Sequence, residues 1–124
     1  MTRVLVVDDE PRVARAIEFA LSNSDVELVS LTDPAQVESV AAAQRPDAIL
    51  LDIGLKTADG LELCRRLKAD QRFRDIPVLL LSGQTDPGTK ATGLAAGADD
   101  FVGKPFVPTE LLARINAQIR KRNG

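Results

Sequence analysis

Five polar side chains with useful chemistry follow short apolar runs in the sequence. They are Asp8, Asp9, Asp52, Ser82 and Lys104. The runs before them are apolar at nearly every position, which is typical of parallel strands that are covered on both faces. Because parallel strands end at one edge of their sheet, where open α/β sheets bind ligands, we expect these five side chains to meet there.

Three carboxylates, one hydroxyl and one ammonium group in a single place favour phosphoryl chemistry with a divalent cation. Crowded carboxylates repel one another and tend to retain protons, and a cation removes that conflict. Mg²⁺ accepts a few carboxylates together with waters and phosphate oxygens. A carboxylate can itself be the nucleophile and form an aspartyl phosphate. A phosphoryl group on Asp52 would then have Mg²⁺, Lys104 and the Ser82 hydroxyl around its oxygens.

Each of these residues also has a purely structural interpretation. A polar residue after a strand is often a cap, which suits Asp8 or Ser82 equally well. A single lysine such as Lys104 is usually a solvated side chain. Asp52 is harder to explain in this way because four apolar residues precede it and Ile53 follows it. The combined placement therefore favours a site.

Apolar runs alternate with helical periodicity along the whole chain. Strands are predicted at 4–7, 26–31, 48–51, 76–81 and 101–102. Helices begin near residues 11, 33, 60 and 108, and a further short helix follows the fourth strand through 94–95. The helix that ends near Gly97 is the weakest, because glycine disfavours helix interiors. Five strands alternating with five helices predict a parallel sheet with right-handed crossovers and helices on both faces.

Composition limits the function classes. The 124 residues fit one domain covering 1–124, and 44% apolar with 27% charged residues are typical of a globular protein. The net charge of −2 argues against a protein that coats nucleic acid. The absence of histidine excludes histidine catalysis, and the single cysteine excludes an internal disulfide. With no signal peptide or membrane-spanning run, a cytoplasmic location is expected.

Four segments together resemble the receiver domain of bacterial two-component response regulators. They are VLVVDDEP at 4–11, ILLDIGLKTADGLELC at 49–64, IPVLLLSG at 76–83 and GADDFVGKPF at 97–106. The resemblance implies a flavodoxin-like sheet with strand order 2-1-3-4-5. It also implies a signalling switch rather than a conventional enzyme. Its phosphoryl group would come from a sensor histidine kinase or a phosphotransfer protein, and it would control an output domain or partner.

The resemblance implies a role for each residue of the cluster. Asp52 would be the phosphoacceptor. Asp9, Asp52 and the backbone carbonyl of Gly54 would bind Mg²⁺ directly, and Asp8 would complete the acidic pocket through water. The Ser82 hydroxyl and the Lys104 ammonium would contact the phosphoryl group.

Two further positions are expected to support the switch. The peptide bond between Lys104 and Pro105 would be cis, an arrangement that needs a structural reason. Phe101 occupies the family's aromatic switch position. Ser82 would move toward the phosphoryl group and the Phe101 ring would swing inward, which would reshape the surface formed by the fourth helix, fifth strand and fifth helix. The alternative is that Phe101 is only a core residue.

The sequence departs from the family pattern near the site. Lys56 replaces a proline that is usual in this loop, so the loop is expected to be more mobile. Gly54 provides no side chain beside Asp52, and Gln84 stands two residues after Ser82. Side chains at the positions of Gly54 and Gln84 tune how fast the family loses its phosphoryl group, so no lifetime is predicted.

The end of the chain looks most like receivers that are joined to winged-helix DNA-binding domains. Such receivers pair through the surface described above, with ion pairs across the dimer. The candidates here are Lys90, Asp99, Asp100, Glu110, Arg114 and Arg120. An ordinary solvated surface is the alternative. DNA contact is expected only through an output domain absent from this chain, and the basic run 120–122 is interpreted as a helix end.

Two rival functions fit less well. A phosphatase of the haloacid-dehalogenase type also uses a strand-end aspartate, Mg²⁺ and a lysine, but needs a second aspartate two residues later, where this chain has Gly54. A pseudo-receiver that never takes phosphate is the second rival. Such modules usually lack an acidic-pocket residue or the lysine, and this chain keeps them.

Overall fold

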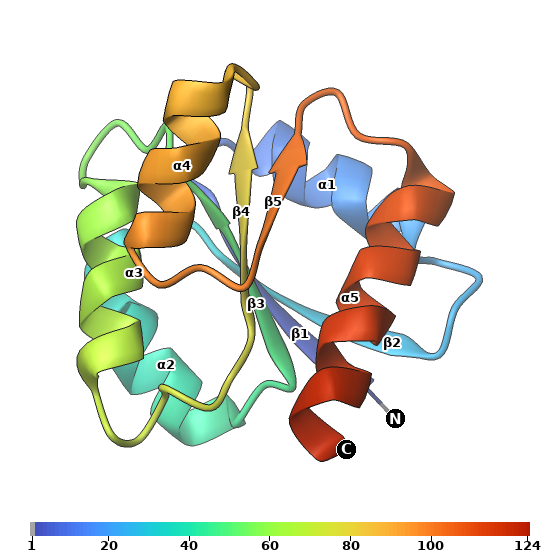
Figure 1. Ribbon diagram of the computed structural model, residues 1–124. Helices are drawn as coiled ribbons and strands as arrows, with labels where there is room; N and C mark the ends of the chain where they lie inside the picture. Colours follow the sequence, from blue (N-terminus) through green and yellow to red (C-terminus); the bar gives the residue numbers. More distant parts are fainter. Residues whose placement is uncertain (1) are drawn as a thin grey trace.

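A five-stranded parallel sheet forms the centre of the computed structural model, which describes residues 2–124 (Figure 1). Its strands are β1 (Thr2–Val7), β2 (Val26–Leu31), β3 (Ala48–Asp52), β4 (Val78–Ser82) and β5 (Asp100–Gly103). They lie in the order β2-β1-β3-β4-β5, and every neighbouring pair is parallel. The predicted flavodoxin-like fold is confirmed.

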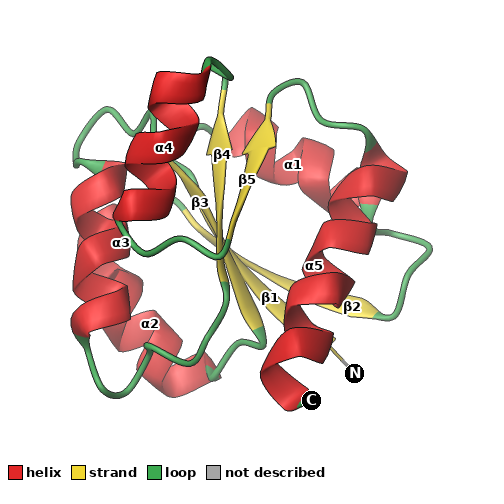
Figure 2. Cartoon of the chain, in the orientation of Figure 1, coloured by secondary structure: helices red, strands yellow, loops and turns green. Residues whose placement is uncertain are grey.

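Helices cover both faces of the sheet (Figure 2). They are α1 (Pro11–Ala20), α2 (Val37–Gln44), α3 (Gly60–Ala69), α4 (Pro87–Ala95) and α5 (Pro108–Asn123). The helices α1 and α5 pack on one face, and α2, α3 and α4 pack on the other. Alternate strand residues point to opposite faces, so Leu5 and Ile49 belong to the α2–α3 side while Val4 and Leu50 belong to the α1–α5 side. This two-sided burial explains why the strands are apolar without interruption.

Two elements begin later than the sequence predicts, each for a local reason. The strand predicted from residue 76 begins at Val78, because Pro77 has no N–H for the ladder and contributes only its carbonyl, which accepts from Ile49 N at 2.9 Å. The helix expected at Pro34 opens with a single 3₁₀ turn (Pro34–Gln36), where the Asp33 carboxylate accepts the Ala35 N–H. None of the helices among residues 2–124 is long and apolar enough to cross a membrane.

Candidate functional site

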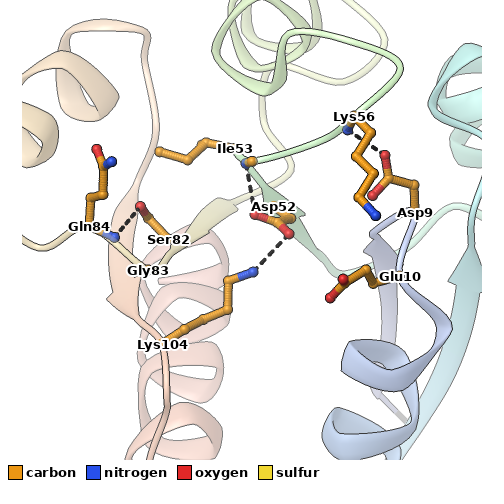
Figure 3. A pocket seen from close by; sticks show the side chains of 10 residues that line it. Asp9, Glu10, Asp52, Ile53, Lys56, Ser82, Gly83, Gln84 and Lys104 are labelled. Carbon is orange, nitrogen blue, oxygen red and sulfur yellow. Dashed lines mark hydrogen bonds and ion pairs between the residues drawn. The ribbon is translucent and has the colours of Figure 1, made fainter.

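The five predicted side chains lie at the carboxyl edge of the sheet, and Figure 3 shows four of them, Asp9, Asp52, Ser82 and Lys104. Asp8 and Asp9 follow β1, Asp52 ends β3, Ser82 ends β4 and Lys104 follows β5. Four of them line a cavity of about 380 Å³, whose walls also include Glu10, Ile53, Gly54, Lys56, Gly83 and Gln84. The fifth, Asp8, is buried beneath it with 1% of its surface exposed. The strand register thus brings together four segments that are far apart in the sequence.

Asp52 lies at the centre of the cavity and is held in its charged form. Its Oδ2 accepts a hydrogen bond from Lys104 Nζ at 2.8 Å, and its Oδ1 accepts from Gly54 N at 2.8 Å. Burial favours the neutral carboxyl group, but these hydrogen bonds outweigh burial and lower the pKa of Asp52. A buried, ionised and oriented carboxylate is suited to act as a nucleophile.

The pKa of the neighbouring Asp8 is shifted in the opposite direction to that of Asp52. Its Oδ1 accepts the Glu10 N–H at 2.8 Å, but its buried Oδ2 has no partner among the described residues. Burial, and then the neighbouring Asp52, raise the pKa of Asp8 to about 7. The neighbouring carboxyl groups titrate as a pair, so the pKa of Asp8 rises while Lys104 and the Gly54 N–H lower that of Asp52. The unpartnered oxygen is also where a cation would be most favourable.

Asp9 is engaged elsewhere in this structure. Its Oδ2 accepts the backbone N–H of Lys56 at 2.5 Å, which ties the end of β1 to the loop that follows Asp52. Within residues 2–124, no three acidic, histidine or cysteine side chains converge closely enough to hold a metal by themselves. The unpartnered Asp8 oxygen and the neighbouring Asp52 carboxylate are donors of the kind that suits Mg²⁺, which completes its shell with water and backbone carbonyls.

Ser82 and Phe101 are both buried here. The Ser82 Oγ accepts the Gln84 N–H at 3.0 Å, which leaves its own hydroxyl proton available to another acceptor. Phe101 is 8% exposed and belongs to the core on the α3–α4 side. Its ring packs against α4 so closely that a Cβ on Gly93 would lie 3.2 Å from it. The switching movement of these two residues remains a prediction.

The turn after β5 positions the lysine. The backbone N–H of Lys104 donates to the Ser82 carbonyl at 2.7 Å, so Lys104 continues the pairing of β5 with β4. The Lys104–Pro105 peptide bond is cis. The ammonium group therefore extends over the cavity toward Asp52 (Figure 3).

Gly60 is a positioning residue that the sequence analysis treated only as a helix boundary. It is the first residue of α3, after the N-cap Asp59, whose carboxylate accepts the Leu61 and Glu62 N–H groups. A Cβ at Gly60 would lie 2.6 Å from the Asp52 carbonyl oxygen and 2.5 Å from Ile53 Cα. Only glycine lets α3 begin this close to the peptide that carries the nucleophile.

Most of the predicted dimer-face charges are paired within the chain. Arg114 donates to both carboxylate oxygens of Asp100, at 2.9 and 3.1 Å, and to Glu110 at 3.0 Å. Asp99 pairs with Lys68 at 2.8 Å. The other two candidates, Lys90 and Arg120, have no ion pair with any carboxylate of residues 2–124. A dimer through this surface therefore remains a prediction, and forming it would require these pairs to be exchanged.

Residues 4–116 match the response regulator receiver domain family. The chain belongs to this family. It is 40% identical to the phosphate regulon transcriptional regulatory protein PhoB of Pseudomonas aeruginosa over 118 residues, 95% of this chain and 52% of that protein. It is 42% identical to the transcriptional regulatory protein PrrA of Mycobacterium tuberculosis over 122 residues, 98% of this chain and 52% of that one. The receiver domain thus spans about half the length of these curated relatives.

Solved structures agree with this assignment. A putative response regulator from Chloroflexus aurantiacus superposes with a TM-score of 0.90 at 31% identity, covering 96% of this chain and 98% of that one. Chemotaxis response regulator CheY4 of Vibrio cholerae gives a TM-score of 0.86 at 27% identity, covering 95% and 98%. The resemblance to receiver domains and the flavodoxin-like fold, both expected from the sequence, are confirmed.

Proposed function

We propose that this receiver domain, taken as residues 1–124, accepts a phosphoryl group on Asp52 from a sensor histidine kinase or a phosphotransfer protein. The observation that carries the proposal is the state of Asp52. Asp52 is 5% exposed, its pKa is lowered by its hydrogen bonds, and its carboxylate is held by Lys104 and the Gly54 N–H in an otherwise open cavity. A buried carboxylate without a reaction to perform would more commonly be fully enclosed by its partners.

The side chains of the cavity have complementary parts in the transfer. An Asp52 oxygen attacks phosphorus, an O–P bond forms, and the bond to the donor breaks with its electron pair leaving on the donor. Lys104 Nζ can then bond a phosphoryl oxygen instead of the carboxylate oxygen that it holds now. The Ser82 hydroxyl can donate its free proton to another oxygen. Mg²⁺ held by Asp8, Asp9, Asp52 and the Gly54 carbonyl would neutralise the remaining negative charge.

The output follows from the neighbouring surface. Ser82 and Phe101 would transmit phosphorylation to the surface of α4, β5 and α5, where a homodimer would form, with Lys90, Asp99, Asp100, Glu110, Arg114 and Arg120 as candidate contacts. The regulators that resemble this chain are about twice its length, and a further domain would make the response. A cytoplasmic location and a non-enzymatic role stay predictions. Sedimentation with and without a phosphoryl mimic tests the dimer, and an unchanged monomer contradicts it.

Intact mass spectrometry after incubation with acetyl phosphate tests the transfer itself. We expect one phosphoryl adduct that requires Mg²⁺ and is absent from Asp52→Ala. Glu18→Gln, which removes an exposed carboxylate of α1, is the matched control and should be labelled like the parent. No adduct at early times and low temperature would contradict the proposal and favour the pseudo-receiver. An adduct that persists in Asp52→Ala would show that Asp52 is not the nucleophile.

A further inference from the structure

Four cations from three separate segments gather at the edge of the sheet opposite Asp52. They are Arg45, Arg74, Lys121 and Arg122, and we call them the basic edge. One follows α2, one lies in the loop between α3 and β4, and two belong to the end of α5. In Figure 1 these segments lie at the end of the sheet away from the tips of the strand arrows.

Two adjoining hollows make the basic edge a continuous strip. A hollow of about 430 Å³ has Arg45 and Arg122 among its lining residues, and a second of about 480 Å³ has Arg74, Lys121 and Arg122. Arg122 and Asp75 line both hollows, so Arg122 connects the two halves of the strip. The strip is therefore one surface and not two unrelated groups of side chains.

These four cations make few interactions with the rest of the described chain. In the part of the chain from residue 2 onward, none of the four forms an ion pair, and Arg122 makes only a 3.5 Å hydrogen bond to the Asp47 carbonyl. The neighbouring cations Arg72 and Lys68 do have carboxylate partners. Asp75 is the carboxylate that both hollows share, and Asp99 of the second hollow is already held by Lys68.

Arg45 is informative because its backbone disfavours arginine. It ends α2 in the left-handed region with φ 48°, where glycine or asparagine is usual. The interaction of cations with a helix carboxyl end explains Lys121 and Arg122 at the end of α5. It does not explain Arg74, which lies in a loop. A ligand that needs all of these charges accounts for them together.

The surroundings of the strip indicate which ligand it fits. The apolar floor of the first hollow comes from residues that are already buried, with Ala41 1%, Phe73 2% and Ile76 6% exposed. A protein partner would gain little apolar contact there, although such contacts dominate protein interfaces. A row of free cations without an apolar anchor suits a regularly charged backbone, because phosphate contacts provide affinity through charge alone.

We propose that the basic edge binds the sugar–phosphate backbone of nucleic acid without reading its sequence. The net charge of −2 is compatible with this role because the cations are confined to one edge, away from the acidic cavity. The proposal adds a contact by the receiver itself to the expectation that an output domain contacts DNA. The inference is independent of phosphorylation, since no residue of the Asp52 cavity takes part.

Fluorescence anisotropy with a fluorescein-labelled duplex of about 20 base pairs, in low salt, tests the proposal. Four phosphate contacts give a slope of about −3 to −4 in log affinity against log salt, or roughly a hundredfold loss for a fourfold rise in salt. The variant Arg74→Gln/Arg122→Gln should bind at least about tenfold more weakly and lose about two units of slope. Arg45→Asn, which suits the left-handed backbone, should lose about one unit.

Arg12→Gln/Arg15→Gln is the matched control. It removes two exposed cations of α1 that form no ion pair within residues 2–124, and it leaves the same net charge of −4 (−2 minus two). It should bind like the parent. An equal loss in this control would overturn the proposal, as would no binding by the parent in low salt. In a competition experiment, polyglutamate and unlabelled duplex are compared at equal concentrations of negative charge. If polyglutamate displaces the labelled duplex more effectively, the edge is assigned to acidic proteins instead. Circular dichroism melts identify variants that do not fold. Arg122→Glu, at the exposed end of α5, is a second test of whether charge at this edge controls binding.

Discussion

Replacing Asp8 with asparagine should stabilise the protein at neutral and alkaline pH. Asp8 is an acid whose pKa in the folded state is about 7, against 3.8 ordinarily, because burial and Asp52 disfavour its charged form. The raised pKa means that the stabilising contribution of Asp8 is complete below pH 3.8 and is lost as the pH rises through about 7. The asparagine variant has no such proton to lose, and its side-chain oxygen can still accept the Glu10 N–H.

The magnitude follows from the shift. A change from 3.8 to about 7 corresponds to about 4 kcal/mol at most, at 1.36 kcal/mol per pKa unit. Asp52 moves in the opposite direction within the same pair, so we expect about 1–3 kcal/mol above pH 7. For a domain of 124 residues this is a rise of roughly 4–12 °C in Tm.

Urea denaturation and thermal melts from about pH 4 to about pH 8 measure the effect, with Mg²⁺ chelated. The decisive quantity is the stability of Asp8→Asn minus that of the parent, because titrating groups that are not coupled to Asp8 contribute equally to both proteins and cancel. This difference should be small near pH 4, grow through pH 5–7 and level off above the pKa of about 7. Glu18→Gln should give a difference of less than about 0.5 kcal/mol at every pH. A difference for Asp8→Asn that is flat with pH, or negative at about pH 8, would refute the reasoning.

Three other expectations can be measured on the same samples. Gly60→Ala should lower the free energy of unfolding, measured in urea, by about 1–3 kcal/mol, because its Cβ would meet backbone atoms at 2.5 and 2.6 Å. Gly83→Ala, whose Cβ would have nothing within 4 Å, should have a much smaller effect. Equal effects of the two substitutions would contradict this. Lys104→Met removes the 2.8 Å bond to buried Asp52 and should cost about 1.5–3 kcal/mol at neutral pH, less in acid, with loss of the acetyl phosphate adduct. Burial raises the pKa of the Cys64 thiol to about 11, so iodoacetamide at about pH 8 should label it only after unfolding, and rapid native labelling would show otherwise.

The sequence was sufficient for the fold because its strands are buried on both faces and read as continuous apolar runs. It also predicted which residues meet, since the ends of parallel strands share one edge. The distribution of protons between Asp8 and Asp52 was not predictable, because it depends on burial and on the hydrogen bond from Lys104. Pairings made by loops were equally hidden, such as Asp9 with the Lys56 N–H.

The basic edge was not predictable from the sequence for a related reason. Its cations lie between positions 45 and 122 and form one surface only after the crossovers return each segment to the same edge. Along the chain, the basic run 120–122 is interpreted as an ordinary helix end, and Arg45 and Arg74 each stand far from it in sequence. Charge patterns predict a binding surface from sequence only when they fall within one element.

The paired state of the α4–β5–α5 surface limits what can drive dimerisation there. Exchanging the Arg114 pairs with Asp100 and Glu110 for equivalent pairs across a dimer leaves the number of ion pairs unchanged. Exposed pairs contribute little individually, so such an exchange adds register and specificity more than affinity. Affinity must then come from apolar contact, and Leu94 of α4 is 53% exposed on one of these elements. For the proposed homodimer, we therefore expect apolar contact by Leu94 to contribute affinity and the exchanged ion pairs to set the register of the two copies.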